Sequence, residues 1–192
     1  MAEMNRFARW LVNRRTGSRA RRVLRRLEGH LDLPGGSRVL ELGSGGGGML
    51  ALLHERLQPA TLVGTDFDPA QIAAARAYLA SRWGSVPPSV ELRAADALSL
   101  PFSDGSFDGV FALMMLHHVE EHHTAYARRP DALKEIRRVL RSRGLFVYSD
   151  IFRRKEIRAT LSELGFVPEY VRSTWRSDLA VYRAPSAPPH AP

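Results

Sequence analysis

The chain of 192 residues contains no cysteine and only two lysines, Lys134 and Lys155. Without thiols it can form neither a disulfide framework nor a thiolate metal site, and no reaction can proceed through a cysteine adduct. No apolar run approaches the roughly 20 residues that cross a bilayer, and the N-terminus lacks the apolar core of a secretory signal. We therefore expect a cytoplasmic location, with at most a peripheral contact to membranes.

Positive charge is concentrated at the N-terminus. The first 30 residues carry nine arginines against two glutamates, which accounts for +7 of the total charge of +8. Apolar residues recur there at helical spacing in two stripes, the first made of Met4, Phe7, Trp10 and Leu11 and the second of Ala20, Val23, Leu24, Leu27 and Leu31. The pattern predicts two short amphipathic helices with arginine faces over residues 1–32.

Several roles remain open for this basic segment. We expect its apolar stripes to pack on the following domain, or to cap its ligand site as a lid, while the arginines stay solvated. Contact with an anionic membrane surface is the first alternative. RNA binding is less favoured, because the sequence holds no recognisable RNA-binding module. The segment is also similar in composition to an organellar transit peptide, although Glu3 argues against that interpretation.

A glycine-rich turn follows the first predicted strand. Branched apolar residues over 38–42 predict a short buried strand, and helical spacing of apolar residues follows over 47–57. Small residues build the turn between them, namely Gly43, Ser44, Gly45 and Gly47. Glycine permits positive φ and a close approach of the backbone to a ligand. Strand, tight turn and helix in this order predict a site for a nucleotide-like ligand.

Glu41, two residues before the first glycine, discriminates between two ligand classes. The glycines also satisfy the G-x-G-x-x-G pattern of dinucleotide-binding folds. A dinucleotide places its pyrophosphate at the helix N-terminus, where a carboxylate would oppose it. S-adenosylmethionine has no phosphate and carries a sulfonium and an ammonium group, both of which a carboxylate attracts. Glu41 therefore favours S-adenosylmethionine.

Two further acids stand at the ends of predicted strands. Asp66, followed by Phe67, ends the strand predicted at 61–66 and could accept both hydroxyls of a ribose. Hydrogen bonds to a charged partner contribute about 1.5 to 3 kcal/mol each, so Asp66 should be a main determinant of affinity. Asp96, followed by Ala97, comes after the third predicted strand and could accept from an adenine amino group. Three acids at successive strand ends argue against a phosphate site.

Predicted strands and helices alternate along the chain. Strands are predicted at 38–42, 61–66, 89–94, 107–113, 144–149, 166–172 and 178–183, and helices at 47–57, 69–82, 130–141 and 154–164. This alternation predicts an α/β fold with a mostly parallel sheet and helices on both faces. We assign residues 33–184 to one ligand-binding domain and expect a disordered, proline-rich tail at 185–192.

The order and spacing of several motifs carry a family resemblance that spans about residues 38–183. These motifs are Glu41-x-Gly43-x-Gly45-x-Gly47, then 64–69, 96–102, 106–108, 116–119, 133–140 and 144–146. Together they resemble the class I S-adenosylmethionine-dependent methyltransferases, within them the ubiquinone and menaquinone (methyltransferase type 11) subgroup. The resemblance implies a Rossmann-like, seven-stranded sheet with an antiparallel last strand. It also implies that Glu41 lies near the methionyl end of the cofactor, Asp66 at the ribose and Asp96 at the adenine.

His117 and His118 follow the fourth predicted strand at its carboxyl end, where open α/β sheets keep their active sites. A neutral imidazole there could remove a proton from a hydroxyl or an activated carbon, or it could merely orient the acceptor. Both roles stay open, because proximity and orientation alone can drive displacement at an activated sulfonium. His118, Glu121 and His122 formally match a zinc motif, but the context is a nucleotide-binding sheet, so we expect no metal.

The acceptor is predicted to be a small or lipid-like molecule. The fourth strand is not followed by the Asn or Asp, two prolines and aromatic residue that usually support methylation of base amines. Apolar residues follow the strand instead, namely Leu113, Met114, Met115 and Leu116. They suit a flat or apolar acceptor such as a quinone, although packing in the core explains them equally well. A nicotinamide-dependent oxidoreductase and a non-catalytic S-adenosylmethionine-binding regulatory module are the alternatives. The sequence carries no signal for the oligomeric state.

Overall fold

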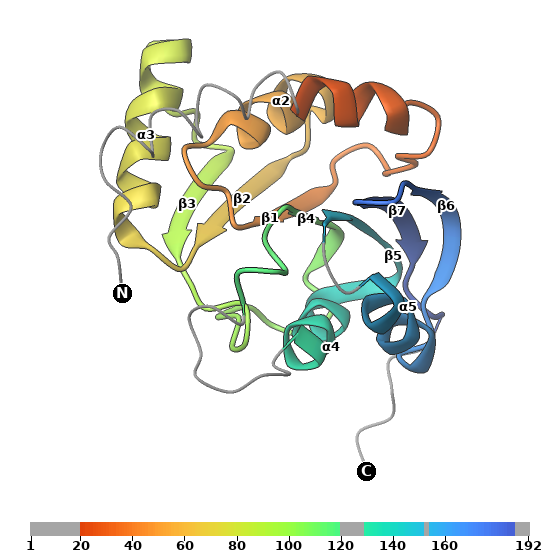
Figure 1. The fold of residues 1–192 in the computed structure, drawn as a ribbon. Helices are drawn as coiled ribbons and strands as arrows, with labels where there is room; N and C mark the ends of the chain where they lie inside the picture. The colour runs from red at the N-terminus through yellow and green to blue at the C-terminus, as the bar shows by residue number, and fades with distance from the viewer. Residues whose placement is uncertain (1–19, 120–128, 152–153, 187–192) are drawn as a thin grey trace.

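The computed structural model describes residues 20–119, 129–151 and 154–186 (Figure 1). The strands of its sheet are β1 (Arg38–Leu42), β2 (Thr61–Asp66), β3 (Val90–Ala94), β4 (Phe107–Leu113), β5 (Leu140–Asp150), β6 (Val167–Ser173) and β7 (Asp178–Arg183). The labelled helices are α2 (Gly48–Leu57), α3 (Pro69–Trp83), α4 (Arg129–Val139) and α5 (Arg154–Glu163), and residues 20–27 form a further helix. Strands and helices therefore alternate as the sequence predicts.

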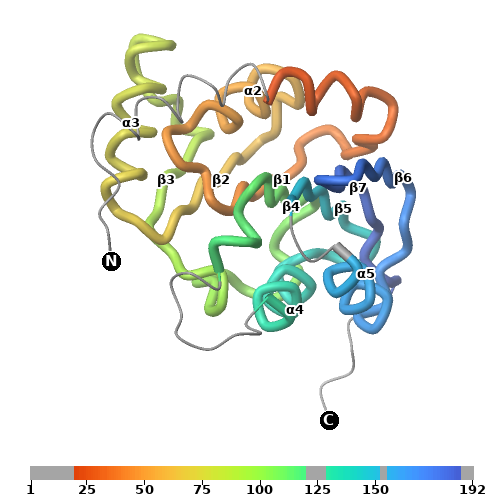
Figure 2. Tube along the Cα trace, viewed as in Figure 1, coloured from red at the N-terminus to blue at the C-terminus, as the bar shows by residue number. Residues whose placement is uncertain are grey.

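The strands form one sheet in the order β3-β2-β1-β4-β5-β7-β6. Strands β1 to β5 pair in parallel, and β7 is antiparallel to both of its neighbours. Figure 2 shows the result as two halves, with the yellow and lime strands β2 and β3 on one side of β1 and the green to blue strands on the other. The predicted Rossmann-like fold with its antiparallel last strand is confirmed. Because β1 pairs directly with β4, the topological switch point lies between them, beside the loops that follow both strands.

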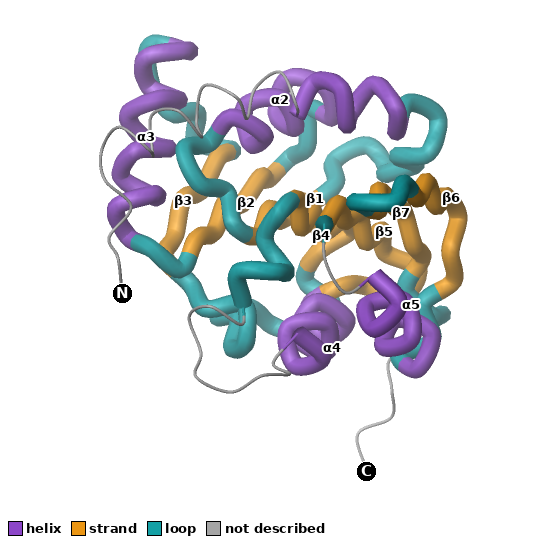
Figure 3. The backbone as a smooth tube through the Cα atoms, viewed as in Figure 1, coloured by secondary structure: helices purple, strands orange, loops and turns teal. Residues whose placement is uncertain are grey.

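Helices cover both faces of the sheet (Figure 3). On one face, α4 and α5 bury apolar side chains against the strands, with Leu133, Ile136, Ile157, Leu161, Phe146 and Tyr148 in one cluster. On the other face, α2, α3 and the helix at residues 20–27 do the same, with Leu24, Leu27, Leu50, Leu53, Leu79 and Val147 in a second cluster. Residues that alternate along β5 enter opposite clusters, which explains why its apolar run is nearly continuous.

The helix at residues 20–27 is amphipathic as predicted. Its apolar side chains Ala20, Leu24 and Leu27 are buried against α2 and the sheet, while the arginines between them, Arg21, Arg22, Arg25 and Arg26, are exposed. The second apolar stripe thus packs on the domain, and its arginines face solvent. The first stripe, with Phe7 and Trp10, lies outside the described residues.

The boundary between α4 and β5 differs from the prediction. The helix expected to reach residue 141 ends at Val139, and β5 begins at Leu140 instead of 144. Leu140 pairs with Phe107, and the regular ladder resumes where Gly109 pairs with Leu145. Long-range pairing with β4 therefore takes Leu140 into the sheet, although its local sequence continues the helical pattern.

Candidate functional site

The turn after β1 has the backbone conformation that its glycines predict. Gly43, Gly45 and Gly47 all have positive φ, at +69°, +49° and +81°. A Cβ atom at Gly43 would lie 2.6 Å from Cβ of Met115, and one at Gly47 would lie 3.2 Å from Cβ of Ala75. A Cβ atom at Gly45 would meet no atom of the described residues within 4 Å. Close packing thus requires glycine at the two outer positions, whereas Gly45 borders open space that a ligand could approach.

Asp66, at the carboxyl end of β2, holds this turn in place. Its Oδ2 accepts the backbone N–H of Gly45 at 2.9 Å, and its Oδ1 accepts that of Asp68 at 3.0 Å. The backbone N–H of Ser44 also donates to the carbonyl of Thr65 at 2.8 Å. A carboxylate oxygen can accept more than one hydrogen bond, so a carboxylate that holds a turn can also bind ligand hydroxyls. Asp66 is therefore placed to organise the turn and to bind a ligand.

Glu41 and Ser44 bring unsatisfied polar atoms to the base of the turn. Glu41 is 3% exposed. Among the residues that the structure describes, neither its Oε2 nor the hydroxyl of the buried Ser44 has a hydrogen-bond partner. Burial, with a smaller contribution from the negative charge of Asp66, raises the pKa of Glu41 well above the usual range of a glutamate. Buried polar atoms normally have partners, so these two point to a ligand that supplies them. A cationic ligand would stabilise the ionised form of Glu41.

The third acid follows β3 on the same edge of the sheet. The backbone N–H of Ala95 donates to the carbonyl of Asp66 at 2.9 Å, which ties the ends of β2 and β3 together. Oδ1 of Asp96 accepts the N–H of Leu98 at 2.9 Å, and Ala97 beside it is partly buried. Phe67 is 48% exposed and offers an aromatic surface next to Asp66. The fold thus brings the predicted cofactor residues to the carboxyl ends of β1, β2 and β3.

The structure distinguishes His117 from His118. Nδ1 of His117 lies 2.9 Å from Oδ1 of Asp150, at the end of β5, and the imidazole is largely buried. His118 is exposed, and its ring lies 3.9 Å from that of His117. Sequence reasoning missed Asp150, although an acid at the carboxyl end of a predicted strand was a signal that had already been used for Asp66. Only the pairing of β4 with β5 reveals its partner.

The apolar run after β4 has mixed roles. Leu116 is fully buried in the core, and Leu113 packs against the cluster on the α2 face. Met115 packs against the opposite cluster and contacts the glycine turn at Gly43. Packing therefore explains much of the run that suggested an apolar acceptor. Glu121, His122 and His123 lie outside the described residues.

A match to known proteins agrees with this geometry. The model of the methyltransferase domain family matches residues 40–148, more than half of the chain and the part that holds Glu41, Asp66, Asp96 and both histidines. The chain belongs to the methyltransferase domain family. This membership confirms the predicted resemblance, and it confirms S-adenosylmethionine as the cofactor of the family. The unpartnered atoms of Glu41 and Ser44, and the open space at Gly45, fit that cofactor.

Individual members of the family are similar over part of their length. A probable phthiotriol/phenolphthiotriol dimycocerosates methyltransferase 2 of Mycobacterium ulcerans is 39% identical over 118 residues, which are 60% of this chain and 40% of that protein. The demethylmenaquinone methyltransferase of Thermus thermophilus is 37% identical over 112 residues, which are 57% of this chain and 45% of that protein. The chain thus matches less than half the length of these relatives.

The fold of this family member is also found among solved structures. A SAM-dependent methyltransferase from Aquifex aeolicus superposes with a TM-score of 0.68 and 17% sequence identity, covering 86% of this chain and 89% of the other. At this level of identity the match supports the fold alone.

Proposed function

We propose that this family member transfers a methyl group from S-adenosylmethionine to a lipid-like or quinone-like acceptor. When bound, the cofactor supplies an electrophilic methyl group on a positively charged sulfur. In this proposal Glu41 attracts the methionyl end, Asp66 accepts the ribose hydroxyls, and Asp96 with Ala97 borders the adenine. The glycine turn at 43–47 lets the cofactor approach the backbone, and Phe67 covers it from the solvent side.

The observation that carries the proposal is the buried carboxylate of Glu41, whose pKa is raised and whose Oε2 has no partner within residues 20–119, 129–151 and 154–186. A dinucleotide would bring phosphates to the turn above this group, and their charge would oppose its ionisation. A sulfonium or ammonium group has the opposite effect. The same charge argument disfavours a nicotinamide-dependent oxidoreductase.

The acceptor class is inferred from the relatives and from the site. One relative is named for a phthiotriol lipid and another for demethylmenaquinone, so both names describe acceptors with large apolar parts. Met115 is partly buried beside the glycine turn. In this proposal it gives the acceptor an apolar and adaptable contact. These observations support an apolar acceptor over a nucleic acid.

Calorimetric titration of the purified protein with S-adenosylhomocysteine tests the cofactor assignment. We expect micromolar binding of S-adenosylhomocysteine and none of NADH or NADPH, because only the first lacks phosphates. Transfer of a radiolabelled methyl group to quinols, long-chain phenols or lipids would then exclude a non-catalytic module, and RNA serves as the negative control. Binding of a nicotinamide nucleotide alone would contradict the proposal and redirect the search to hydride transfer.

We further propose that the arginine face of the helix at residues 20–27 contacts an anionic membrane surface, from which an apolar acceptor is drawn. None of the helices in the described part of the chain is long and apolar enough to cross a bilayer. Four exposed arginines can each gain about 1 kcal/mol near an anionic surface. In flotation assays the protein should bind phosphatidylglycerol vesicles and not phosphatidylcholine vesicles. Replacing Arg21, Arg22, Arg25 and Arg26 by glutamine should abolish this binding, and unchanged flotation would refute the contact.

A further inference from the structure

The loop between β3 and β4 forms a tight turn at residues 96–99. Oδ1 of Asp96 accepts the N–H of Leu98 at 2.9 Å, and the backbone carbonyl of Asp96 accepts the N–H of Ser99 at 3.1 Å. Leu100 follows this turn directly and is buried in the core, with 4% of its surface exposed. Leu100 therefore fixes one end of the turn that carries Asp96.

Helix α4 holds Leu100 by both polar groups of its backbone. Oε2 of Glu135 accepts the N–H of Leu100 at 2.7 Å, and Nη2 of Arg138 donates to the carbonyl of Leu100 at 2.9 Å. Glu135 and Arg138 are three residues apart, so their side chains lie on the same face of the helix. The two side chains therefore pair with Leu100 as a neighbouring strand would.

The guanidinium of Arg138 also binds the part of the loop that leads on to β4. Its Nη1 donates to the carbonyl of Phe102 at 2.7 Å and to Oδ1 of Asp104 at 2.8 Å. The backbone carbonyl of Arg138 accepts the N–H of Gly105 at 2.9 Å. One arginine thus contacts the loop at several points between Leu100 and Gly105.

An ion pair aligns the two side chains of α4. Nε of Arg138 donates to Oε1 of Glu135 at 2.7 Å, and Nη2 donates to Oε2 at 2.8 Å. These hydrogen bonds lower the pKa of Glu135, which therefore stays ionised at neutral pH. The side chains are 30% and 19% exposed, so water screens the pair less than it would screen a fully exposed one. An arginine–carboxylate pair with two parallel bonds has a defined orientation, which the loop shares.

We propose that Glu135 and Arg138 are positioning residues for the adenine end of the cofactor site, and that they set its selectivity for adenine. This inference rests on the proposed function, in which Asp96 lies at the adenine, and specifies how that contact is made. Neither residue has to touch the cofactor, because both act through the backbone of the loop. A binding group is effective only when its neighbours hold it within about 0.5 Å of its productive position.

The amino group of adenine provides the probe. If Asp96 accepts a hydrogen bond from that group, an S-adenosylhomocysteine analogue whose base is purine, which lacks the amino group, should bind more weakly. A hydrogen bond to a charged partner changes affinity by about tenfold or more. The ratio of the two affinities therefore reports whether Asp96 is in place. General damage to the cofactor site would weaken the binding of both ligands alike and leave this ratio unchanged.

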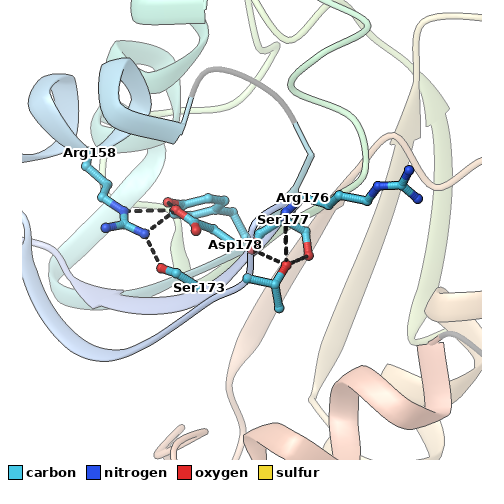
Figure 4. A network of polar contacts seen from close by, with 7 residues as sticks. Arg158, Ser173, Arg176, Ser177 and Asp178 are labelled. Carbon is cyan, nitrogen blue, oxygen red and sulfur yellow. Dashed lines mark hydrogen bonds and ion pairs between the residues drawn. The ribbon is translucent and has the colours of Figure 1, made fainter.

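Arg158 of α5 provides a matched control. Its Nε and Nη2 donate to Oδ2 of Asp178 at 2.9 and 2.7 Å, and it also donates to the hydroxyl of Ser173 (Figure 4). These partners belong to β6 and β7, which lie at the opposite end of the sheet from β3. Arg158→Gln therefore breaks an arginine–carboxylate pair on a neighbouring helix without changing the contacts of the loop that carries Asp96.

Calorimetry with the two ligands compares the wild-type protein with Arg138→Gln, Glu135→Gln and Arg158→Gln. The wild-type protein should prefer S-adenosylhomocysteine to the purine analogue by about 10- to 100-fold. Arg138→Gln should reduce this preference to about threefold or less, with little change in the affinity for the analogue. Glu135→Gln should have an intermediate effect, because glutamine can still accept the N–H of Leu100 but loses the ion pair. Arg158→Gln should keep the wild-type preference, although both arginine variants should have lower melting temperatures.

The ratio of affinities also distinguishes a positioning role from a structural one. A full preference in Arg138→Gln, together with lowered stability, would overturn the proposal and leave the proposed function intact. An equal loss of preference in Arg158→Gln would overturn it as well, since the effect would then not depend on the loop. If Arg138→Gln does not fold, the preference of Glu135→Gln decides: a reduced value supports the proposal, and a wild-type value refutes it.

The wild-type protein separates this proposal from the proposed function. Binding of S-adenosylhomocysteine without preference over the purine analogue would refute the adenine contact, and with it the positioning role of α4, but not the cofactor assignment. Absence of S-adenosylhomocysteine binding would instead refute the proposed function.

Discussion

Replacing Asp66 by asparagine is expected to weaken binding of S-adenosylhomocysteine at least about 100-fold, and replacement by alanine should abolish it. Two hydrogen bonds from ribose hydroxyls to a carboxylate would contribute about 3 kcal/mol or more together. The carboxylate also accepts the N–H groups of Gly45 and Asp68, so its loss would loosen the glycine turn as well. Calorimetry at constant pH and salt measures the change.

A deoxy ligand separates the two roles of Asp66. In the wild-type protein, an S-adenosylhomocysteine analogue without ribose hydroxyls should bind as weakly as the natural ligand binds to Asp66→Asn. In Asp66→Asn the two ligands should differ little, because the group that tells them apart is gone. If the variant still discriminates fully between them, another residue holds the ribose.

Asp68→Ala is the control for damage to this segment. The side chain of Asp68 caps α3 by accepting the N–H of Ala70 at 2.8 Å. Its removal should lower stability by about 0.5 to 2 kcal/mol while leaving ligand affinity nearly unchanged. Full affinity in Asp66→Ala would show that the cofactor site has been assigned to the wrong residues.

Glu41→Gln is expected to stabilise the ligand-free protein and to weaken cofactor binding by about 10- to 100-fold, through loss of a charge-assisted hydrogen bond. Burial raises the pKa of Glu41 in the folded state, so the folded protein retains a proton that the unfolded chain releases. The contribution of Glu41 to the free energy of unfolding is fully present below the ordinary pKa of glutamate. It is lost as the pH rises toward the raised pKa. Glutamine does not ionise, so Glu41→Gln does not lose this stability. The difference in melting temperature between the variant and the wild-type protein should therefore grow over the same pH range.

The affinity for the cofactor should have the reverse pH dependence. Cofactor binding to the wild-type protein should tighten as pH rises through this range, because ionised Glu41 attracts the positive methionyl end. In Glu41→Gln this contribution to the pH dependence should vanish. A variant that binds as tightly as the wild-type protein at every pH would refute the role of Glu41.

Glu55→Gln is the matched control for Glu41. Glu55 is an exposed acid on α2, and its hydrogen bond with Arg82 lowers its pKa. The contribution of Glu55 to the free energy of unfolding therefore has the opposite pH dependence to that of Glu41. It is present above the ordinary pKa of glutamate and is lost as the pH falls through the lowered pKa of Glu55. Glu55→Gln should not stabilise the protein at high pH, and it should leave cofactor affinity unchanged.

Local patterns in the sequence were sufficient for most of the fold. Apolar alternation and helical spacing located the strands and helices, because those periodicities follow from backbone geometry. The end of α4 was predicted wrongly. Leu140 pairs with Phe107 in the sheet, although the apolar spacing of its neighbours is helical. Pairing between strands is a long-range event that local spacing does not encode.

The sequence by itself determined the glycine turn, the acids Glu41, Asp66 and Asp96 at their strand ends, and the family to which they belong. Each of these signals lies within a few residues of chain. Only the tertiary structure decided that Oε2 of Glu41 and the hydroxyl of Ser44 are buried without a partner in the described part of the chain, and that His117 contacts Asp150, 33 residues away. The side-by-side placement of β4 and β5 creates that contact, and helices on both faces exclude water. Neither the order of the strands in the sheet nor the exclusion of water from the site is a property of a single segment.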